Sequence, residues 1–156
     1  MLTEITGVDG DLPAGKVVII ASRYNEGICD SLVGGSVQTL TAAGYAESDI
    51  QVVRVPGAWE LVLSAANALD RQDVSAVVTL GCVIKGETTH DEHINRAVSD
   101  ALMRLGVETR KPIGFGLLTC NTLEQALQRS GGNVGNKGVE AAEAAIEMLR
   151  LEKKLA

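Results

Sequence analysis

Four short apolar runs are spaced along the chain, and each is rich in β-branched residues. They cover residues 16–21, 50–55, 75–83 and 113–119. A short, continuous apolar run of this kind is typical of a strand that is buried on both faces in a parallel sheet. The pattern therefore predicts four strands, each followed by a polar, glycine-containing or proline-containing turn.

The segments that follow these strands carry apolar residues at helical spacing. From Ile28 to Leu40 they recur every three or four residues, and Gly44 is predicted to end this helix. Thr122 and Gln125 form a capping-box pattern, which predicts the start of a short helix. Three further helices are expected. One covers 58–72, and one runs from the acidic segment after His90 to Gly106. The last follows a glycine-rich link at 131–138 and runs from Val139 through Leu149.

Strand and helix alternate four times, which predicts an α/β fold with right-handed crossovers. We expect a three-layer α/β/α sandwich of the flavodoxin-like type with a four-stranded parallel sheet, formed by a single domain over residues 1–156. Residues 1–15 hold too few apolar side chains for a core of their own. This N-terminal arm is therefore expected either to fray or to pack on another surface, such as a neighbouring subunit.

Composition and charge exclude several classes of protein. The net charge of −6 and the lack of a basic block argue against a surface for nucleic acid or anionic membrane. The acidic N-terminus lacks the apolar core of a signal peptide, and no apolar run approaches the roughly 20 residues that span a bilayer. Cys29, Cys82 and Cys120 show no CxxC spacing and are expected to be buried, reduced thiols. We therefore expect a cytoplasmic protein.

Ligands of open α/β sheets bind beyond the carboxyl ends of the strands. The turns that leave the four predicted strands, 22–27, 56–60, 81–90 and 119–122, are therefore expected to hold the site. Aromatic and polar residues gather in these turns: Arg23, Tyr24, Asn25, Trp59, Glu60, Lys85, Glu87 and His90.

The turn at 81–90 has the features of an anion site. A strand leads through two glycines into a helix whose first turn is acidic, and the backbone N–H groups of 86–89 can point at one spot. The positive end of the helix dipole favours negative charge there, and His90 lies beside it. The loop matches neither the P-loop nor the GxGxxG pattern. The residues alone thus predict a small anionic ligand, with proton transfer by His90.

Each of these residues also has a purely structural interpretation. His90 is compatible with an exposed residue of a first helical turn, and Tyr24 and Trp59 with a cover over apolar surface. The Glu60 carboxylate would be stabilised by the positive end of a helix dipole. Arg129 would interact with the C-terminal carbonyls of the short helix.

Five segments carry a resemblance to a known family. They are SRYN (22–25), VPGAWE (55–60), GCVIKGETTH (81–90), FGLLTCNTLEQALQRSG (115–131) and GNKG (135–138). In this order and at this spacing they resemble the 6,7-dimethyl-8-ribityllumazine synthases of riboflavin biosynthesis, over nearly the whole chain. Any one segment would be weak, but the five together are highly specific.

The resemblance implies a transferase that joins 5-amino-6-(D-ribitylamino)uracil to 3,4-dihydroxy-2-butanone 4-phosphate. An amine attacks the ketone to give an imine, phosphate is eliminated, and the ring closes with loss of water. The family uses neither metal nor organic cofactor, so none is expected here. His90 and His93 are three residues apart and could pair on a metal, but no third ligand is evident.

The resemblance also implies roles for individual residues. His90 would transfer protons, and residues 86–89 would form the phosphate loop: Gly86, Glu87, Thr88 and Thr89. The residues expected to stack on, hold or line the pyrimidine and its ribityl chain are Tyr24, Ala58, Trp59, Glu60, Val83, Ile84 and Lys85.

Three further matches belong to residues that a neighbouring subunit supplies in the family: Phe115, Arg129 and Lys137. A helix that begins at Thr122 would carry Arg129 about 10 Å along its axis, which takes it away from its own strand ends.

Four positions depart from the family pattern. Asp91 and His93 stand where aromatic residues are usual, Trp59 replaces Phe or a smaller residue, and Cys120 stands where Thr is common.

Assembly is implied by the resemblance as well. Family members form pentamers, and those with a short link between the last two helices pack further into icosahedral shells. The link at 131–138 has no insertion, which predicts the shell rather than the free pentamer. The N-terminal arm would then add a strand to the sheet of a neighbouring subunit, and riboflavin synthase is a candidate partner.

Two other classes stay open on the sequence. A non-enzymatic flavodoxin-like module that binds a flavin or nucleotide would explain the sheet and the anion loop, but not Arg129 and Lys137 beside a glycine-rich link. A catalytically silent, shell-forming or flavin-binding relative would keep the assembly without releasing phosphate.

Overall fold

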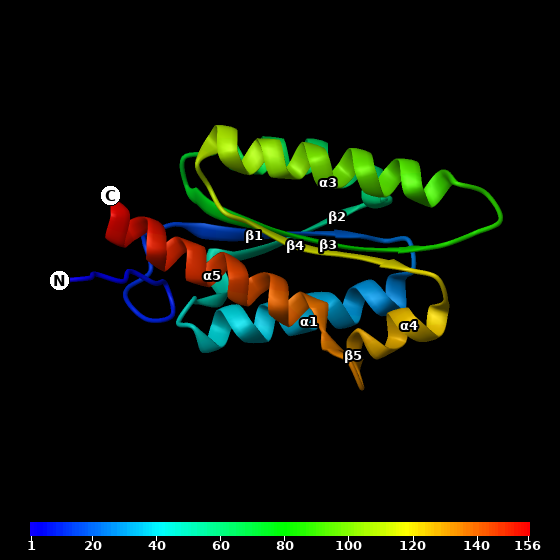
Figure 1. Cartoon of the computed structure of the whole chain (residues 1–156), viewed down its shortest axis with the longest axis horizontal. Coiled ribbons are helices and arrows are strands. Elements are labelled where there is room, and N and C mark those ends of the chain that lie inside the picture. The colour runs from blue at the N-terminus through cyan, green and yellow to red at the C-terminus, as the bar shows by residue number, and fades with distance from the viewer.

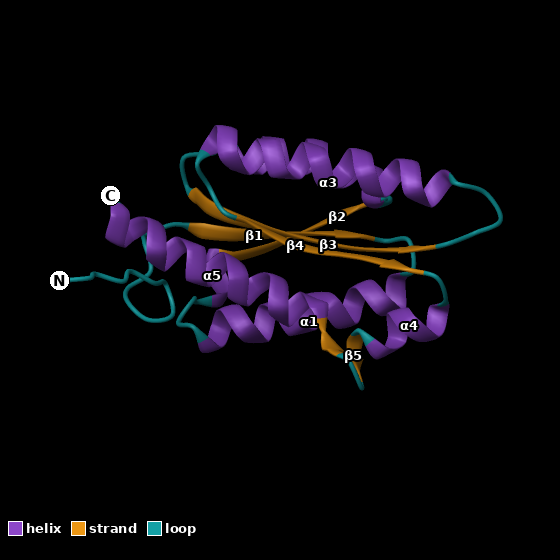
Figure 2. Cartoon of the chain, in the orientation of Figure 1, coloured by secondary structure: helices purple, strands orange, loops and turns teal.

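The computed structural model describes residues 1–156 and holds a parallel sheet between two layers of helices (Figures 1 and 2). The strands are β1 (Lys16–Ser22), β2 (Ile50–Val55), β3 (Val74–Ile84) and β4 (Ile113–Cys120), in the order β2-β1-β3-β4. One face is covered by α1 (Glu26–Ala42) and α5 (Lys137–Leu155), the other by α2 (Leu61–Leu69) and α3 (His90–Thr109). The predicted three-layer α/β/α flavodoxin-like fold is confirmed.

Shorter elements complete the chain. They are the 3₁₀ turns η1 (Glu47–Asp49) and η2 (Ala58–Glu60), helix α4 (Leu123–Gln128), and a small antiparallel pair, β5 (Ser130–Gly132) and β6 (Gly135–Asn136). No helix is both long and apolar enough to cross a membrane.

The central strand β1 shows why a continuous apolar run forms a parallel strand. Val17, Ile19 and Ala21 pack into the core under α1 and α5, whereas Val18 and Ile20 pack into the core under α2 and α3. All five are fully buried. Because successive side chains point to opposite faces, a strand covered on both sides needs an apolar residue at every position.

Helix ends follow the predicted chemistry in two places. After α1, Gly44 takes a φ of +113°, and the N–H groups of Gly44 and Tyr45 close the last turn on Thr41 and Leu40. This is the left-handed glycine stop that the sequence predicts. Before α4, the Thr122 hydroxyl accepts a hydrogen bond from the Gln125 N–H at 3.2 Å, as a capping residue does.

The predicted end of α3 at Gly106 is wrong, because the helix continues to Thr109. Pro112 disfavours helical backbone at Lys111, so the chain has to leave the helix just before that residue. It does so at Arg110, which adopts the left-handed conformation with a φ of +58°. The helix predicted over 58–72 is also shorter than expected, because its first turn is the 3₁₀ turn η2 and α2 ends at Leu69.

Two glycines allow α5 to lie close to its neighbours. A side chain at Gly138 would overlap the carbonyl oxygen of Leu32 in α1, and one at Gly114 would overlap that of Ala141. The start of α5 therefore sits directly on α1, and its second turn sits directly on β4. The Asn136 side chain accepts from Gly138 N–H at 2.8 Å and begins the helix at this contact.

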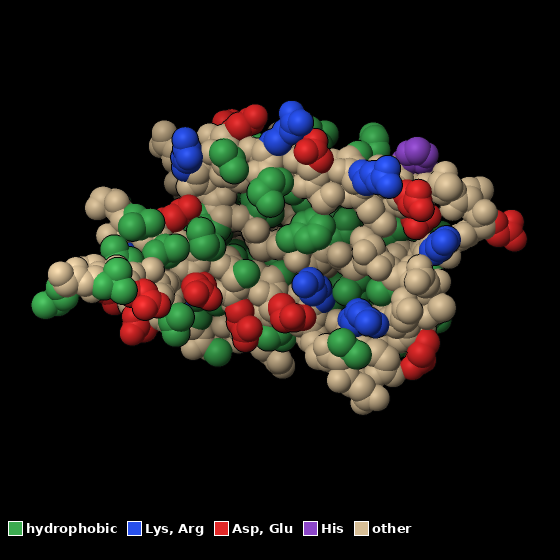
Figure 3. Space-filling view, viewed as in Figure 1, with side chains coloured by type: hydrophobic (Ala, Val, Ile, Leu, Met, Phe, Trp, Pro, Cys, Tyr) green, Lys and Arg blue, Asp and Glu red, His purple; other side chains and the backbone are tan.

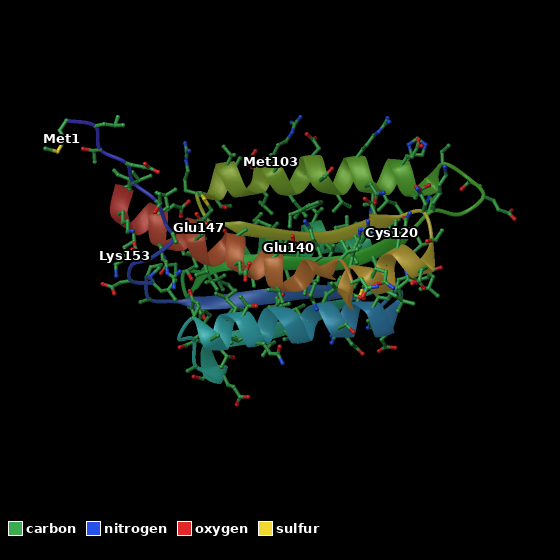
Figure 4. The ribbon with its side chains drawn as sticks, turned by 60° about the horizontal axis from the view of Figure 1, so that its bottom comes forward. Met1, Met103, Cys120, Glu140, Glu147 and Lys153 are labelled. Carbon is green, nitrogen blue, oxygen red and sulfur yellow. The ribbon has the colours of Figure 1, made fainter.

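The N-terminal arm (residues 1–15) forms no strand in the single chain and packs on the end of α5. Lys154 donates to the Thr6 carbonyl at 2.8 Å and pairs with the Asp9 carboxylate at 3.0 Å. A side chain at Gly7 would overlap the Glu147 carbonyl oxygen. The end of the arm at Met1 extends away from the sheet (Figure 4).

Candidate functional site

The strand order makes a switch point at the carboxyl ends of β1 and β3, and the region between the turns that leave these two strands (residues 23–25 and 85–89) is called the crevice. The chain leaves β1 toward the α1 face of the sheet and leaves β3 toward the α3 face, so the two turns diverge at this point. Such a switch point is where open α/β sheets bind ligands. The β3–α3 loop projects beyond the strand ends there (Figures 1 and 2).

The turn after β1 is anchored on both sides of the crevice. Asn25 adopts a left-handed conformation with a φ of +59°, and its side chain donates to the Cys82 carbonyl in β3 at 3.0 Å. The Tyr24 N–H donates to the Pro56 carbonyl at 3.2 Å. These bonds hold the backbone while the Tyr24 ring stays 73% exposed. Tyr24 therefore leaves its ring exposed at this turn rather than covering its own core.

The turn after β2 supplies η2. Ala58 is buried, Glu60 is half-buried, and Trp59 is 62% exposed. Glu60 lies at the start of α2, where the helix dipole favours its charge, and its carboxylate lies beside Gly57. The structural interpretation of Trp59 as a cover over apolar surface does not hold within one chain.

The β3–α3 loop leaves backbone donors free. Lys85 N–H donates to the Cys120 carbonyl at 2.8 Å, but no N–H from Gly86 to Thr89 donates to another part of the protein. His90 follows as the first residue of α3 and is exposed, and its N–H donates to the Thr88 hydroxyl at 3.3 Å. Exposed N–H groups at a helix start form the type of site that binds an anion.

Charges around this loop are mixed. Lys85 precedes it, Glu87 lies within it, and Asp91 and Glu92 make the first turn of α3 acidic. Those carboxylates compete with an external anion for the helix dipole. A strongly held anion would therefore need additional positive charge from outside this loop.

Phe115 does not reach the crevice of its own chain. It lies in β4 and lines a groove of about 650 Å³ together with Leu102 and Met103 of α3 and Met148 of α5. Met103 lies thirteen positions after His90 on α3, a separation of about 20 Å along the helix axis. The 41% exposed Phe115 ring is therefore available only to another molecule.

Arg129 and Lys137 lie together at the β5–β6 hairpin, where the Lys137 N–H donates to the Arg129 carbonyl at 2.9 Å. The displacement of Arg129 from its own strand ends stays a prediction. Helix α4 is only one and a half turns long, and burial raises the pKa of Cys120 at the end of β4 while the Arg129 charge opposes part of that rise. Figure 4 shows Cys120 beside the start of α4.

Arg129 is nevertheless separated from His90 of its own chain by the sheet. Helix α4 buries Ala126 in the core under α1 and α5, whereas α3 packs on the other face. The Arg129 guanidinium also donates to the Gln125 carbonyl at 3.1 Å, as its structural interpretation predicted.

The three cysteines are buried below the crevice. Burial raises the pKa of the Cys82 thiol to about 12 and also raises the pKa values of Cys29 and Cys120. No cluster of three or more His, Cys, Asp or Glu side chains is placed to hold a metal ion.

The strand order and the two helix layers define a flavodoxin-like α/β protein. A sequence profile described as 6,7-dimethyl-8-ribityllumazine synthase matches residues 14–153. The chain belongs to the 6,7-dimethyl-8-ribityllumazine synthase family.

Curated relatives agree over nearly the full chain. The Rhodopirellula baltica 6,7-dimethyl-8-ribityllumazine synthase is 60% identical over 154 residues, which cover 99% of each chain. The protein of the same name from Aquifex aeolicus is 46% identical over 137 residues, 88% of this chain and 89% of that one. The Stenotrophomonas maltophilia protein of this name is 44% identical over 150 residues, 94% of this chain and 97% of that one.

Proposed function

We propose that the protein condenses 5-amino-6-(D-ribitylamino)uracil with 3,4-dihydroxy-2-butanone 4-phosphate to 6,7-dimethyl-8-ribityllumazine, with release of phosphate and water. The observation that carries this proposal is that the family profile matches nearly the whole chain. In the same chain, the free N–H groups of residues 86–89 and His90 lie at one crevice. In this reaction the anion loop binds the phosphate, and the imidazole moves protons during imine formation and phosphate loss.

The pyrimidine would lie between the turns after β1 and β3. The exposed Tyr24 ring offers a stacking face, and half-buried Val83 and Ile84 offer an apolar edge. Ala58 and Glu60 would hold the ribityl chain, since a carboxylate accepts hydrogen bonds from hydroxyl groups.

The phosphate would be held by the N–H groups of residues 86–89, with Lys85 beside them. Positive charge beyond this loop would come from Arg129 and Lys137 of a neighbouring subunit. Two observations support this assignment: Arg129 lies across the sheet from its own His90, and the loop carries acidic neighbours. A guanidinium is well suited to the task because it binds phosphate through two parallel hydrogen bonds.

The assembly we propose is a pentamer in which the groove beside β4 receives the neighbouring copy. Hydrophobic side chains gather between α3 and α5 on this face, and acidic side chains line α5 below them (Figure 3). The groove exposes Met103, Val107 and Met148 as well as Phe115. An apolar surface of this kind is typical of a protein interface.

Larger assembly is proposed on two features. The link between α4 and α5 is a tight hairpin without an insertion, which favours an icosahedral shell over a free pentamer. The outer edge of β2 exposes Val52 and Val53, where the N-terminal arm of a neighbour could add a strand. Native mass measurement distinguishes shell from pentamer, and riboflavin synthase is the partner to test for inside the shell.

The function is tested by mixing the two substrates with the purified protein and measuring phosphate release and lumazine absorbance together. We expect both signals to rise at the same rate. If neither signal rises faster than in the uncatalysed reaction, the function is excluded. That result would favour a catalytically silent relative that only binds ligand.

A further inference from the structure

The chain contains a single Asp-Gly step, at Asp9 and Gly10 in the N-terminal arm, and no Asn-Gly step. An aspartate followed by glycine is prone to one backbone reaction. The next amide nitrogen can reach the side-chain carbon, and glycine has no Cβ to obstruct the approach. Asp9 is therefore the position in this chain where that reaction is most favoured.

Both reacting groups are accessible in the structure. The Asp9 side chain is 91% exposed, and the Gly10 N–H donates to no other group of the protein. Gly10 adopts a φ of +116°, in the region that favours glycine. The arm forms neither helix nor strand at this point, so its backbone has the freedom that ring closure needs.

One contact opposes the reaction. The Lys154 ammonium donates to Asp9 Oδ1 at 3.0 Å and to the Thr6 carbonyl at 2.8 Å, so it holds the carboxylate on the end of α5. This hydrogen bond and the Lys154 charge lower the pKa of the Asp9 carboxyl, and the Arg150 charge acts in the same direction. A lower pKa keeps more of the carboxyl ionised, and the ionised form cannot release water.

We propose that Asp9 is a site of spontaneous isoaspartate formation and that Lys154 slows the reaction. The Gly10 nitrogen bonds to Asp9 Cγ and loses its proton, while one carboxyl oxygen leaves as water and a succinimide ring forms. Water then adds to either ring carbonyl. Breaking the bond from nitrogen to Cγ restores aspartate, whereas breaking the bond from nitrogen to the backbone carbonyl carbon gives isoaspartate. Water is the only co-reactant.

The product changes the path of the arm. Isoaspartate carries the chain through Cβ and Cγ, which adds one carbon to the backbone between Val8 and Gly10. Arg150 donates to the Val8 carbonyl at 3.3 Å, and Lys153 donates to the Leu12 carbonyl at 3.5 Å. The added carbon therefore lies between two contacts that hold the arm on α5. This inference is independent of the proposed function.

The test incubates the purified native protein for several weeks in warm, slightly acidic buffer, beside a sample unfolded in guanidinium. Peptide mapping with electron-based fragmentation distinguishes isoaspartate from aspartate and measures the conversion at Asp9. We expect isoaspartate at Asp9 in the native protein, formed more slowly than in the unfolded sample. Asp11 is the internal control, because Leu12 follows it, and it should stay unchanged.

Lys154→Met and Lys153→Met form a matched pair. Lys154→Met should speed the conversion at Asp9 about two- to fivefold, the range that an exposed ion pair contributes. Lys153→Met removes the same charge from the same helix end, but Lys153 contacts Leu12 rather than Asp9, so the rate should stay near the native value. Asp9→Glu keeps the carboxylate and should form no such product, because its longer side chain closes a larger ring far more slowly.

Three results would overturn the proposal. If the native protein forms no isoaspartate at Asp9, the fold or a neighbouring subunit prevents ring closure. If Lys154→Met and Lys153→Met convert at the same rate, Lys154 does not control the reaction. Equal conversion at Asp11 would mean general degradation of the arm. The samples contain neither substrate, so a failure of lumazine formation would leave the expected conversion unchanged.

Discussion

At the scale of single residues, exposure or burial in the fold decides which side chains can react. His90 is exposed at the first position of α3, beside N–H groups that no other part of the chain uses. Cys82 lies only a few residues earlier in the chain and is buried, with a pKa raised to about 12. One residue can therefore exchange protons with a ligand, while the other is shielded from reaction.

Replacing His90 by Ala should slow turnover by about 100-fold at saturating substrate, near the lower end of what general acid–base help contributes. The rest of the rate would remain, because positioning of an amine and a reactive ketone supplies much of it. Steady-state phosphate release measures this, with circular dichroism to confirm the fold. A turnover number equal to the native value would remove His90 from the mechanism.

The cysteines should resist alkylation in the native protein. Only the thiolate reacts, and a pKa of about 12 leaves Cys82 almost entirely protonated at pH 8. Labelling with a thiol reagent before and after unfolding in guanidinium, followed by peptide mass analysis, should find Cys82 modified only after unfolding. Rapid labelling of the folded protein would show that β3 opens at its carboxyl end.

At the scale of elements, close approach of backbones decides how α5 is placed. The helix starts on an Asn136 cap, lies against α1 at Gly138 and against β4 at Gly114. The same asparagine donates to the Ser31 carbonyl of α1 at 3.0 Å, so the hairpin, the cap and the helix contact form one unit. The position of Lys137 and Arg129 depends on this unit.

Gly138→Ala should therefore destabilise the protein by about 1–3 kcal/mol, the usual effect of forcing one extra carbon into a filled core. The methyl group would overlap the Leu32 carbonyl oxygen and push α5 away from α1. Chemical denaturation measures the change in the free energy of unfolding. Gly34→Ala is the control, because a methyl group there meets no atom within 4 Å and should be tolerated.

At the scale of the whole molecule, we propose that one chain carries halves of two different sites. The crevice with His90 lies at the carboxyl ends of the strands, whereas Phe115 lies in an apolar groove beside β4. Arg129 lies on the opposite face of the sheet from α3. The arrangement fits a ring in which each chain offers one half-site to each neighbour.

Mixing two impaired variants tests this arrangement. Mixed oligomers of His90→Ala and Arg129→Ala chains, unfolded and refolded together, should regain activity at about a quarter of their sites, since random pairing restores intact residues there. Each variant refolded alone provides the control. No recovery would mean that both residues act in the crevice of one chain, which contradicts a shared site.

Several features were settled by local sequence. The four apolar runs, the glycine stop at Gly44 and the cap at Thr122 were predicted correctly because burial pattern and backbone preference act over a few residues. The five motif segments pointed to the family for the same reason, since each is a contiguous stretch. Gly106 was wrongly predicted to end α3, because glycine is tolerated inside a helix. The proline six residues later ends the helix instead.

What the tertiary structure alone decided concerns residues that are distant in sequence. Adjacent β1 and β3 bring Asn25 to Cys82 and so create the crevice, and packing of the arm on α5 brings Asp9 to Lys154. The sheet separates Arg129 from its own His90, because α4 and α3 pack on opposite faces. The local pattern of apolar and polar residues determines which helices and strands form. Their contacts depend on strand order and on which faces pack together, and the spacing of apolar residues determines neither.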